Sequence, residues 1–150
     1  MEPIISQGLC LRPLQDSDAE ALVVAARESL ATVGRWMPWC HSEYTAEEAQ
    51  QWIAVCTQAL AEKSAFNFGV FSADGTELLG GGGLNQFNKQ HNFCNLGYWV
   101  RESKQRQGIA TRIVHALADF GFSVLGLTRI EIVVAEANEP SNGVARKDGA

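Results

Sequence analysis

The chain has 150 residues, 46% of them hydrophobic and 19% charged, and a net charge of −5 at pH 7. This length corresponds to about one domain, which buries enough surface to keep a core without disulfides or a metal. The acidic balance argues against a nucleic-acid partner, because binding to phosphates needs clustered lysine and arginine. The apolar runs are far shorter than the ~20 residues of a transmembrane helix, and no signal peptide is present, so we expect a cytoplasmic protein without a membrane partner.

The cysteines and histidines are too scattered to predict a metal site. No pair of cysteines has C-x-x-C spacing, and the histidines have no spacing typical of metal ligands. We therefore expect no metal, and we expect reduced, buried thiols in a reducing cytosol. The residues concerned are Cys10, Cys40, Cys56, Cys94, His41, His91 and His115.

The first third of the chain predicts a strand, a helix and a loop. A short strand fits residues 9–14. Ser17 and Glu20 have the spacing of a capping box, which predicts a helix over about residues 18–30. Residues 34–39 are aromatic and interrupted by a proline, and they are expected to form a loop.

The middle of the chain predicts a second helix and three strands joined by hairpins. Thr45 and Glu48 form another capping box, and the helix behind it has one apolar face. The strands are expected near residues 66–70, 77–84 and 93–100, with an Asp-Gly turn between the first two. The four glycines Gly80 to Gly83 are expected to kink or bulge the middle strand.

The remaining residues predict a helix over 108–122, a strand over 130–134 and the start of another helix in 140–147. The strand–helix–strand unit over 93–134 is expected to be a parallel crossover. The complete order predicts an α+β, or mixed α/β, layered fold in a single domain over residues 1–150.

The segment from Tyr98 to Ala110 carries the strongest chemical signal. A strand ends in a polar loop, and the loop enters a helix whose first amides have no partner within the helix. The helix dipole adds about half a positive charge there. The small residues Gly108 and Ala110 let an anion approach the backbone. The segment therefore predicts a phosphate site, unless its glycine merely relieves crowding in a plain loop.

Two phosphate-binding motifs are excluded. A P-loop would end in Gly-Lys-Ser/Thr, which this chain lacks. The glycines Gly80 to Gly83 lead into a turn and not into a helix, so they are not a dinucleotide fingerprint.

The run Gln105-Arg106-Gln107-Gly108-Ile109-Ala110 resembles the Gln/Arg-x-x-Gly-x-Gly/Ala signature of the GCN5-related N-acetyltransferases, the GNAT superfamily. The preceding strand, Leu96–Val100, and the segment from Asn138 to Ala145 are similar to further parts of its pattern. The resemblance extends to the RimJ/RimL subgroup, which acetylates N-terminal amines of ribosomal proteins. It rests there on Leu11-Arg12-Pro13-Leu14, Trp36-Met37-Pro38-Trp39 and Thr45-x-x-Glu48. It covers residues 9–150.

This resemblance implies a mostly antiparallel, twisted central sheet with helices on both faces, and acetyl-CoA as the cofactor. The main chain near Val100 would pair with the pantetheine arm like an added strand. Asn138 would bind the amide or thioester end, unless it only shapes a turn. Ser141 would protonate the departing thiolate, cap a helix, or do both. Backbone amides would hold the pyrophosphate at Gln105, Arg106, Gln107, Gly108, Ile109 and Ala110.

The acceptor is expected to be a primary amine, most simply a peptide N-terminal α-amine. Its pKa of about 8 leaves more of it neutral at pH 7 than a lysine amine with a pKa of about 10.4. Trp36 and Trp39 would line the acceptor channel or seal the core. Glu102 and Glu136 are candidate bases or solvated carboxylates. The alternatives are a small amine (amino acid, polyamine or antibiotic) or a non-catalytic module that binds CoA or self-associates.

The pattern departs from the family at its end, because the family fold continues with two more strands beyond the position of Ala150. The expectation is a truncated C-terminal lobe, which would leave the general base unassigned and the strand over 130–134 as an exposed edge. Such an edge favours pairing with another chain. A homodimer or swapped dimer is therefore predicted, and a monodisperse monomer in light scattering would contradict it.

Overall fold

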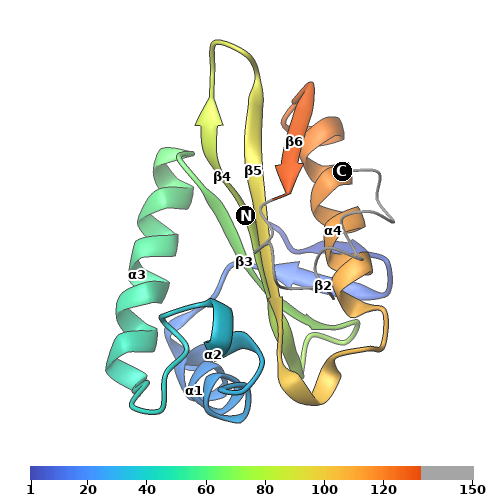
Figure 1. Ribbon diagram of the computed structural model, residues 1–150. Coiled ribbons are helices and arrows are strands. Elements are labelled where there is room, and N and C mark those ends of the chain that lie inside the picture. The colour runs from blue at the N-terminus through green and yellow to red at the C-terminus, as the bar shows by residue number, and fades with distance from the viewer. Residues whose placement is uncertain (133–150) are drawn as a thin grey trace.

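The computed structural model describes residues 1–132, which form one sheet with helices on both sides (Figure 1). The strands follow one another across the sheet in chain order. Every neighbouring pair is antiparallel except β5 and β6, which are parallel, so the predicted mixed sheet and parallel crossover are confirmed. The strands are β1 (Ile4–Ser6), β2 (Leu9–Arg12), β3 (Phe66–Ser72), β4 (Leu78–Asn88), β5 (Phe93–Val100) and β6 (Arg129–Ile132).

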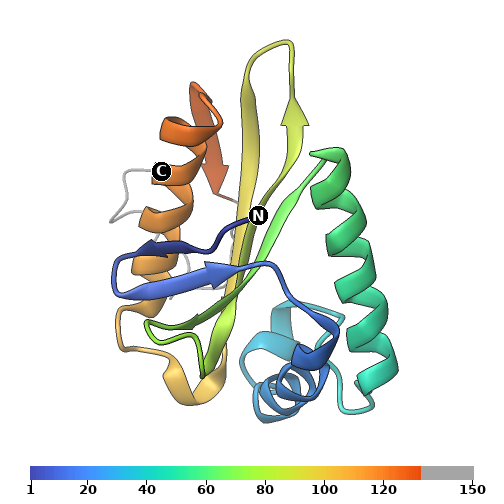
Figure 2. The same ribbon diagram turned by 180° about the vertical axis from the view of Figure 1, so that it is seen from behind.

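The helices divide between the two faces of the sheet, as Figures 1 and 2 show from opposite sides. Helix α4 packs on β4 and β5, whereas α1 and α3 pack against each other and on the opposite face. A π-helical turn, Phe120–Val124, continues α4. The predicted layers are thus confirmed. The helices are α1 (Ala19–Glu28), α2 (Val33–Trp36), α3 (Ala46–Glu62) and α4 (Ile109–Asp119).

Each face of the sheet has its own core. The face toward α4 carries large side chains from alternate strand positions, and these pack on the apolar stripe of that helix. The other face meets α1 and α3 through a smaller cluster. Examples of the first cluster are Phe68, Val70, Leu84, Leu96, Ile113 and Leu117; examples of the second are Leu22, Ala26, Ala49, Ile53 and Phe71. The division leaves room on the α1/α3 face for a site.

The start of α1 differs from the prediction. The carboxylate of Asp18 accepts a hydrogen bond from the Gln15 amide at 2.7 Å and pairs with the Arg12 guanidinium at 2.9 Å. Arg12 thereby holds the pKa of Asp18 below its usual value, against an opposing contribution from burial. The capping box of Ser17 and Glu20 was the wrong pair, because the box is formed one turn earlier by Gln15 and the buried carboxylate of Asp18.

Three other local predictions are settled by the structure. The capping box of Thr45 and Glu48 is confirmed at the start of α3. Residues 34–39 are not entirely loop, since α2 extends to Trp36. The run Gly80–Gly83 does not kink the sheet: it pairs regularly with both neighbours, and the irregular pairing lies on either side of it.

Strand β1 was missed by the sequence analysis, because a strand of three residues is too short to show an alternating pattern.

Candidate functional site

The loop between β5 and α4 presents backbone amides at the start of a helix. Arg106 and Gly108 have positive φ angles of 63° and 77°, and α4 begins at Ile109 directly behind them. Among residues 1–132, no hydrogen-bond partner is found for the amides of 106–110. Unpaired amides and the positive end of the helix dipole together suit a phosphate group. The loop therefore fits the diphosphate of the expected cofactor.

Gln105, the first residue of the predicted set, differs from the residues that follow it, because both its amide and its side chain form hydrogen bonds within the protein. Its amide donates to the Glu102 carbonyl at 3.3 Å, and its side-chain Nε2 donates to the Val100 carbonyl at 2.8 Å. The side chain thus ties the loop to the end of β5. The predicted residues from Gln105 to Ala110 lie together, but Gln105 braces the loop while the following amides stay available.

The same loop is clamped from the other side by Glu28, at the end of α1. Its carboxylate accepts two bonds from the Arg101 guanidinium, at 2.8 and 2.6 Å, and one from the Ser103 hydroxyl at 2.6 Å. Arg101 also donates to the Leu78 carbonyl at 3.0 Å. Chiefly the bonds from Arg101 lower the pKa of Glu28 to about 2. The carboxylate is therefore ionised at neutral pH and holds the loop electrostatically.

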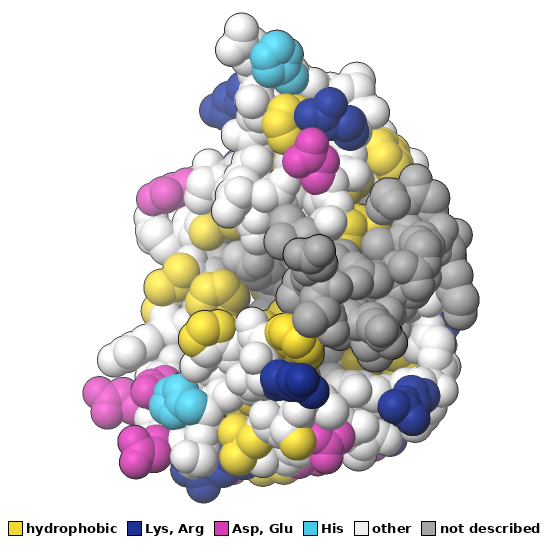
Figure 3. Space-filling model, in the orientation of Figure 1, with side chains coloured by type: hydrophobic (Ala, Val, Ile, Leu, Met, Phe, Trp, Pro, Cys, Tyr) yellow, Lys and Arg dark blue, Asp and Glu magenta, His cyan; other side chains and the backbone are white. Residues whose placement is uncertain are grey.

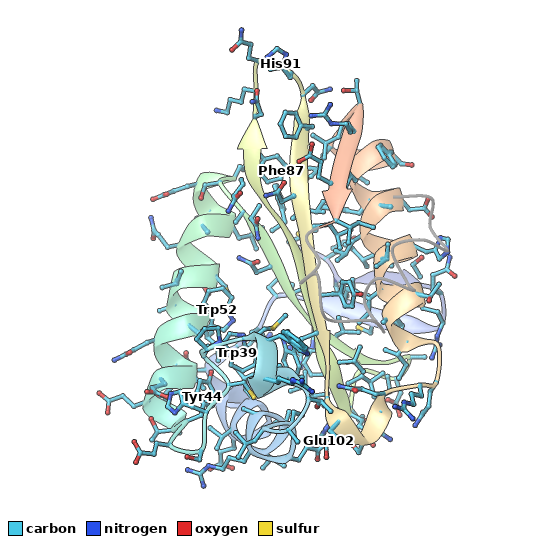
Figure 4. All side chains as sticks on the ribbon, viewed as in Figure 1. Trp39, Tyr44, Trp52, Phe87, His91 and Glu102 are labelled. Atoms are coloured by element: carbon cyan, nitrogen blue, oxygen red, sulfur yellow. The ribbon has the colours of Figure 1, made fainter. Side chains whose placement is uncertain are left out.

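Glu102, a candidate base, points away from the cavity described below (Figure 4). Its carboxylate accepts a bond from the Thr32 hydroxyl at 3.2 Å, and its amide donates to the buried Ser29 hydroxyl at 2.9 Å. These contacts give Glu102 a structural part in fixing the loop to the segment after α1.

Within residues 1–132, strand β5 is paired with β6 along only its first half. The parallel pairing with β6 covers Phe93 to Leu96. Among the described residues, no strand pairs with Gly97–Val100 on that side. A free strand edge is what an extended, amide-bearing arm would need for added-strand pairing. This edge ends at Val100, beside the loop that leads to α4, and the sequence analysis predicted a contact with the pantetheine arm there.

A cavity of about 490 Å³ lies between the sheet and the α1/α3 side of the molecule. Its floor contains Gly69, Gly81, Gly83 and Gly97, from three adjacent strands. A methyl group added to Gly81 would lie 2.3 Å from the Trp99 indole nitrogen, whereas one added to Gly97 would meet nothing within 4 Å. The glycines therefore make room both for the tryptophan beside the cavity and for the cavity itself.

Aromatic side chains form the cavity walls. The Trp39 ring stands edge-on to Trp99 and Tyr44, with centroid separations of 5.2 and 5.6 Å. Trp52 is 45% exposed at the opening. Hydrophobic surface gathers beside α3 (Figure 3), where Figure 4 places Trp39 and Trp52. Of the two tryptophans predicted to line an acceptor channel, Trp39 lines the cavity, while Trp36 lies under the Arg35 guanidinium and is not among the described lining residues.

The polar lining of the cavity was missed by the sequence analysis. Glu48, recognised there only as a helix cap, lines the cavity and lies 3.3 Å from His41. Burial, with a smaller contribution from Glu48, raises the pKa of Tyr44 to about 12, so its hydroxyl keeps its proton at neutral pH. Asn67 and Asn85 also line the cavity. The alternation of Asn and Gly along β3 and β4 was a signal that could have revealed them.

Asn138, Ser141 and Glu136 lie outside the described residues, so their predicted roles remain predictions. Residues 1–132 contain no cluster of His, Cys, Asp or Glu that could hold a metal ion. Over the same range, no helix is both long and apolar enough to cross a bilayer.

Comparison with known proteins gives consistent matches along the chain. Residues 8–150 match the acetyltransferase (GNAT) domain family. The uncharacterized N-acetyltransferase YoaA of Bacillus subtilis is 31% identical over 150 residues, covering 99% of this chain and 83% of the relative. A Vibrio cholerae structure assigned as a ribosomal-protein-serine acetyltransferase is 35% identical with a TM-score of 0.90, covering 100% and 85% of the two chains. RimL, a ribosomal L7/L12 α-N-protein acetyltransferase solved with coenzyme A, is 25% identical with a TM-score of 0.87, covering 98% and 82%.

Proposed function

This chain belongs to the GNAT family of acetyltransferases, and from that premise we propose that it acetylates the N-terminal α-amine of a peptide or protein. It is an N-acetyltransferase, and the family uses acetyl-CoA. The proposal depends most on the glycine-floored cavity, which reaches Gly97, Tyr98 and Trp99 on β5. An acceptor there would meet the open half of β5 from the face opposite α4.

The cofactor supplies an acetyl group already activated as a thioester. The amides of 106–110 would hold its diphosphate, and the free edge of Gly97–Val100 would hold its amide-bearing arm. A backbone N–H near the end of β5 would polarise the thioester carbonyl. The acceptor nitrogen would form the new C–N bond and release one proton as the C–S bond breaks, and this proton would balance the one that the departing sulfur takes up. Asn138 would bind the amide or thioester end, and the hydroxyl of Ser141 would give a proton to the departing sulfur.

A peptide amine as acceptor is supported by two observations. The RimL structure and the Vibrio cholerae structure, which share 25% and 35% identity with this chain, are both described as ribosomal-protein acetyltransferases. An α-amine with a pKa of about 8 also needs less help from a base than lysine does. Trp39 would then contact the acceptor directly.

The test is an acetylation assay on the full 150-residue chain. The acceptors are peptides with free N-termini, the same peptides with blocked N-termini, free amino acids and a polyamine. Free N-termini are expected to give the highest kcat/KM. A higher value for the polyamine or the free amino acids would overturn the peptide assignment. Saturable binding of acetyl-CoA without transfer to any acceptor would favour a non-catalytic CoA-binding domain.

Replacing Ser141 by alanine is expected to lower kcat about tenfold and to leave the KM for acetyl-CoA nearly unchanged. The effect is moderate because a thiol with a pKa of about 8.5 is already a fair leaving group. Steady-state kinetics and the thermal midpoint of the same variant separate the two roles. A lower midpoint with unchanged kcat would assign Ser141 to helix capping.

Three further parts of the proposal concern the whole chain. We propose that residues 1–150 form a single domain, that the protein works in the cytoplasm, and that the outer edge of β6 pairs with a second copy. Four free cysteines, all buried, support a reducing compartment.

A further inference from the structure

The two faces of β3, β4 and β5 differ sharply in side-chain size. Toward α4 they carry large apolar residues such as Phe68, Leu84 and Leu96, which are buried in the core. Toward α1 and α3 the alternate positions are Asn67, Gly69, Gly81, Gly83, Asn85, Asn95 and Gly97. This stretch of glycine and asparagine lies outside the apolar core of the same face, to which Phe71 and Trp99 contribute. It leaves a flat backbone surface with amide side chains at one end.

Asn67 and Asn85 lie close together on that surface. Asn67 pairs with Gly83 on the neighbouring strand, and Asn85 is two residues farther along, which is a diagonal cross-strand position. Neither side-chain amide has a hydrogen-bond partner within residues 1–132, although both line the cavity. Asn95, the partner of Asn85 on β5, instead donates to the Gln86 side chain at 2.6 Å.

The chemistry of the two available amides matches a peptide main chain. Each offers two N–H donors and one carbonyl acceptor, the same kinds of group that a peptide unit presents. An amine without amide groups would leave these donors and acceptors unused. The pair therefore favours an acceptor with a backbone over a simple amine.

The length of the glycine surface also favours a peptide acceptor over a single amino acid. Asn85 lies four positions along β4 from Gly81, and both residues line the cavity. At about 3.3 Å per residue the distance along the strand is about 13 Å, the length of about four extended residues. One amino acid would occupy a fraction of it.

The charge of the cavity favours the amine end of such a peptide. Among the described lining residues, Glu48 is the one carboxylate, and lysine and arginine are absent. The rings of Trp39 and Trp99 also line the cavity and stand edge-on to each other, with a centroid separation of 5.2 Å. A peptide with a positively charged N-terminal amine would be attracted to this cavity, whereas a peptide with acidic residues at its N-terminus would not.

We propose that Asn67 and Asn85 bind the main chain of a peptide acceptor that lies extended on the glycine floor, with its N-terminal amine directed toward Gly97 and Trp99. The inference rests on the proposed function and adds the subsite that recognises the peptide beyond its first residue. Asn67 and Asn85 are thus specificity-determining residues that separate peptides from single amino acids.

The experiment compares N67A, N85A and the double variant with N95A as the matched control. Asn95 has the same side chain on the same face, but its amide is engaged by Gln86 and it does not line the cavity. Each variant is assayed with pentapeptides and with the amide of the corresponding first amino acid. We expect the KM for pentapeptides to rise about fivefold in each single variant and more in the double variant, as for loss of about one neutral hydrogen bond each. The KM for acetyl-CoA and kinetics with the amino-acid amides should stay unchanged.

A second variant fills the floor without touching the asparagines. Gly97→Val adds a side chain where nothing lies within 4 Å, so it should fold normally. It is expected to raise the pentapeptide KM about tenfold or more, because its methyl groups take space meant for the acceptor.

The outcomes separate the inference from the function on which it rests. If the wild-type chain acetylates pentapeptides and both asparagine variants match N95A, the inference is overturned and the proposed function stands. If the wild-type chain acetylates amino-acid amides as efficiently as pentapeptides, the inference also fails. If it acetylates no peptide and no amino-acid amide, both are overturned.

Discussion

Replacing Gly108 by valine is expected to weaken acetyl-CoA binding about 100-fold or more. Gly108 has a φ of 77°, a conformation that costs a β-branched residue about 1–2 kcal/mol. The added side chain would also cover the neighbouring amides at the start of α4. Losing two charge-assisted bonds to phosphate, at about 1.5 kcal/mol or more each, accounts for the factor. Calorimetric titration with acetyl-CoA measures it directly.

Gly75→Val is the matched control. Gly75 has a φ of 79°, and, as at Gly108, nothing lies within 4 Å of an added Cβ. It lies in the turn between β3 and β4, where its amide donates to the Ser72 carbonyl at 2.7 Å. Both variants should lose similar stability, and Gly75→Val should keep its affinity. Wild-type affinity in a folded Gly108→Val protein would remove the loop from the cofactor site.

Replacing Glu28 by glutamine is expected to weaken acetyl-CoA binding about 30-fold, which corresponds to about 2 kcal/mol of lost loop ordering. None of Glu102–Lys104 is buried, so apolar packing cannot hold this part of the loop. Glu28 holds it through Arg101 and Ser103 instead. The variant should raise the KM for acetyl-CoA and leave kcat within about twofold, because Glu28 positions the loop and touches no reacting atom.

Glu77→Gln serves as the control for Glu28→Gln. Glu77 pairs with Lys104 of the same loop at 2.9 Å, but its side chain is 50% exposed. Exposed ion pairs contribute about 0–1 kcal/mol, so the KM should change little. An equal rise in KM for both substitutions would mean that the net charge near the loop governs acetyl-CoA binding, and not the specific contacts of Glu28 with Arg101 and Ser103.

The clamp also predicts how stability depends on pH. Bonds from Arg101 and Ser103 lower the pKa of Glu28 from its ordinary value of 4.5 to about 2. A lowered pKa in the folded state stabilises the protein above the ordinary pKa, and this contribution is lost as the pH falls toward about 2. Allowing for partial solvent screening, we expect wild-type to exceed Glu28→Gln by about 1–2 kcal/mol at pH 7. Urea unfolding should show this gap narrowing between about pH 4.5 and 2; a gap independent of pH would contradict the clamp.

Local patterns in the sequence were sufficient for most of the fold. The alternation in Phe66 to Val70 and the helical spacing around Ile113 each reflect one element and its buried face. The capping box of Thr45 and Glu48 depends on four consecutive residues, so it could be predicted directly. The ion pair of Asp18 could not be predicted in this way, because its partner Arg12 lies at the end of a strand six residues earlier.

The Gln105–Ala110 loop and the cavity differ in the same way. The sequence by itself determined the order of helices and strands along the chain, the family and the Gln105–Ala110 loop, because a loop that starts a helix carries its own amides and its own glycine. Only the tertiary structure decided that Glu28 clamps this loop from α1, and that Trp39, Glu48, Asn67 and Gly97 face one cavity. Those residues come from separate helices and strands, and a contact between distant segments is set by packing, which no local spacing records.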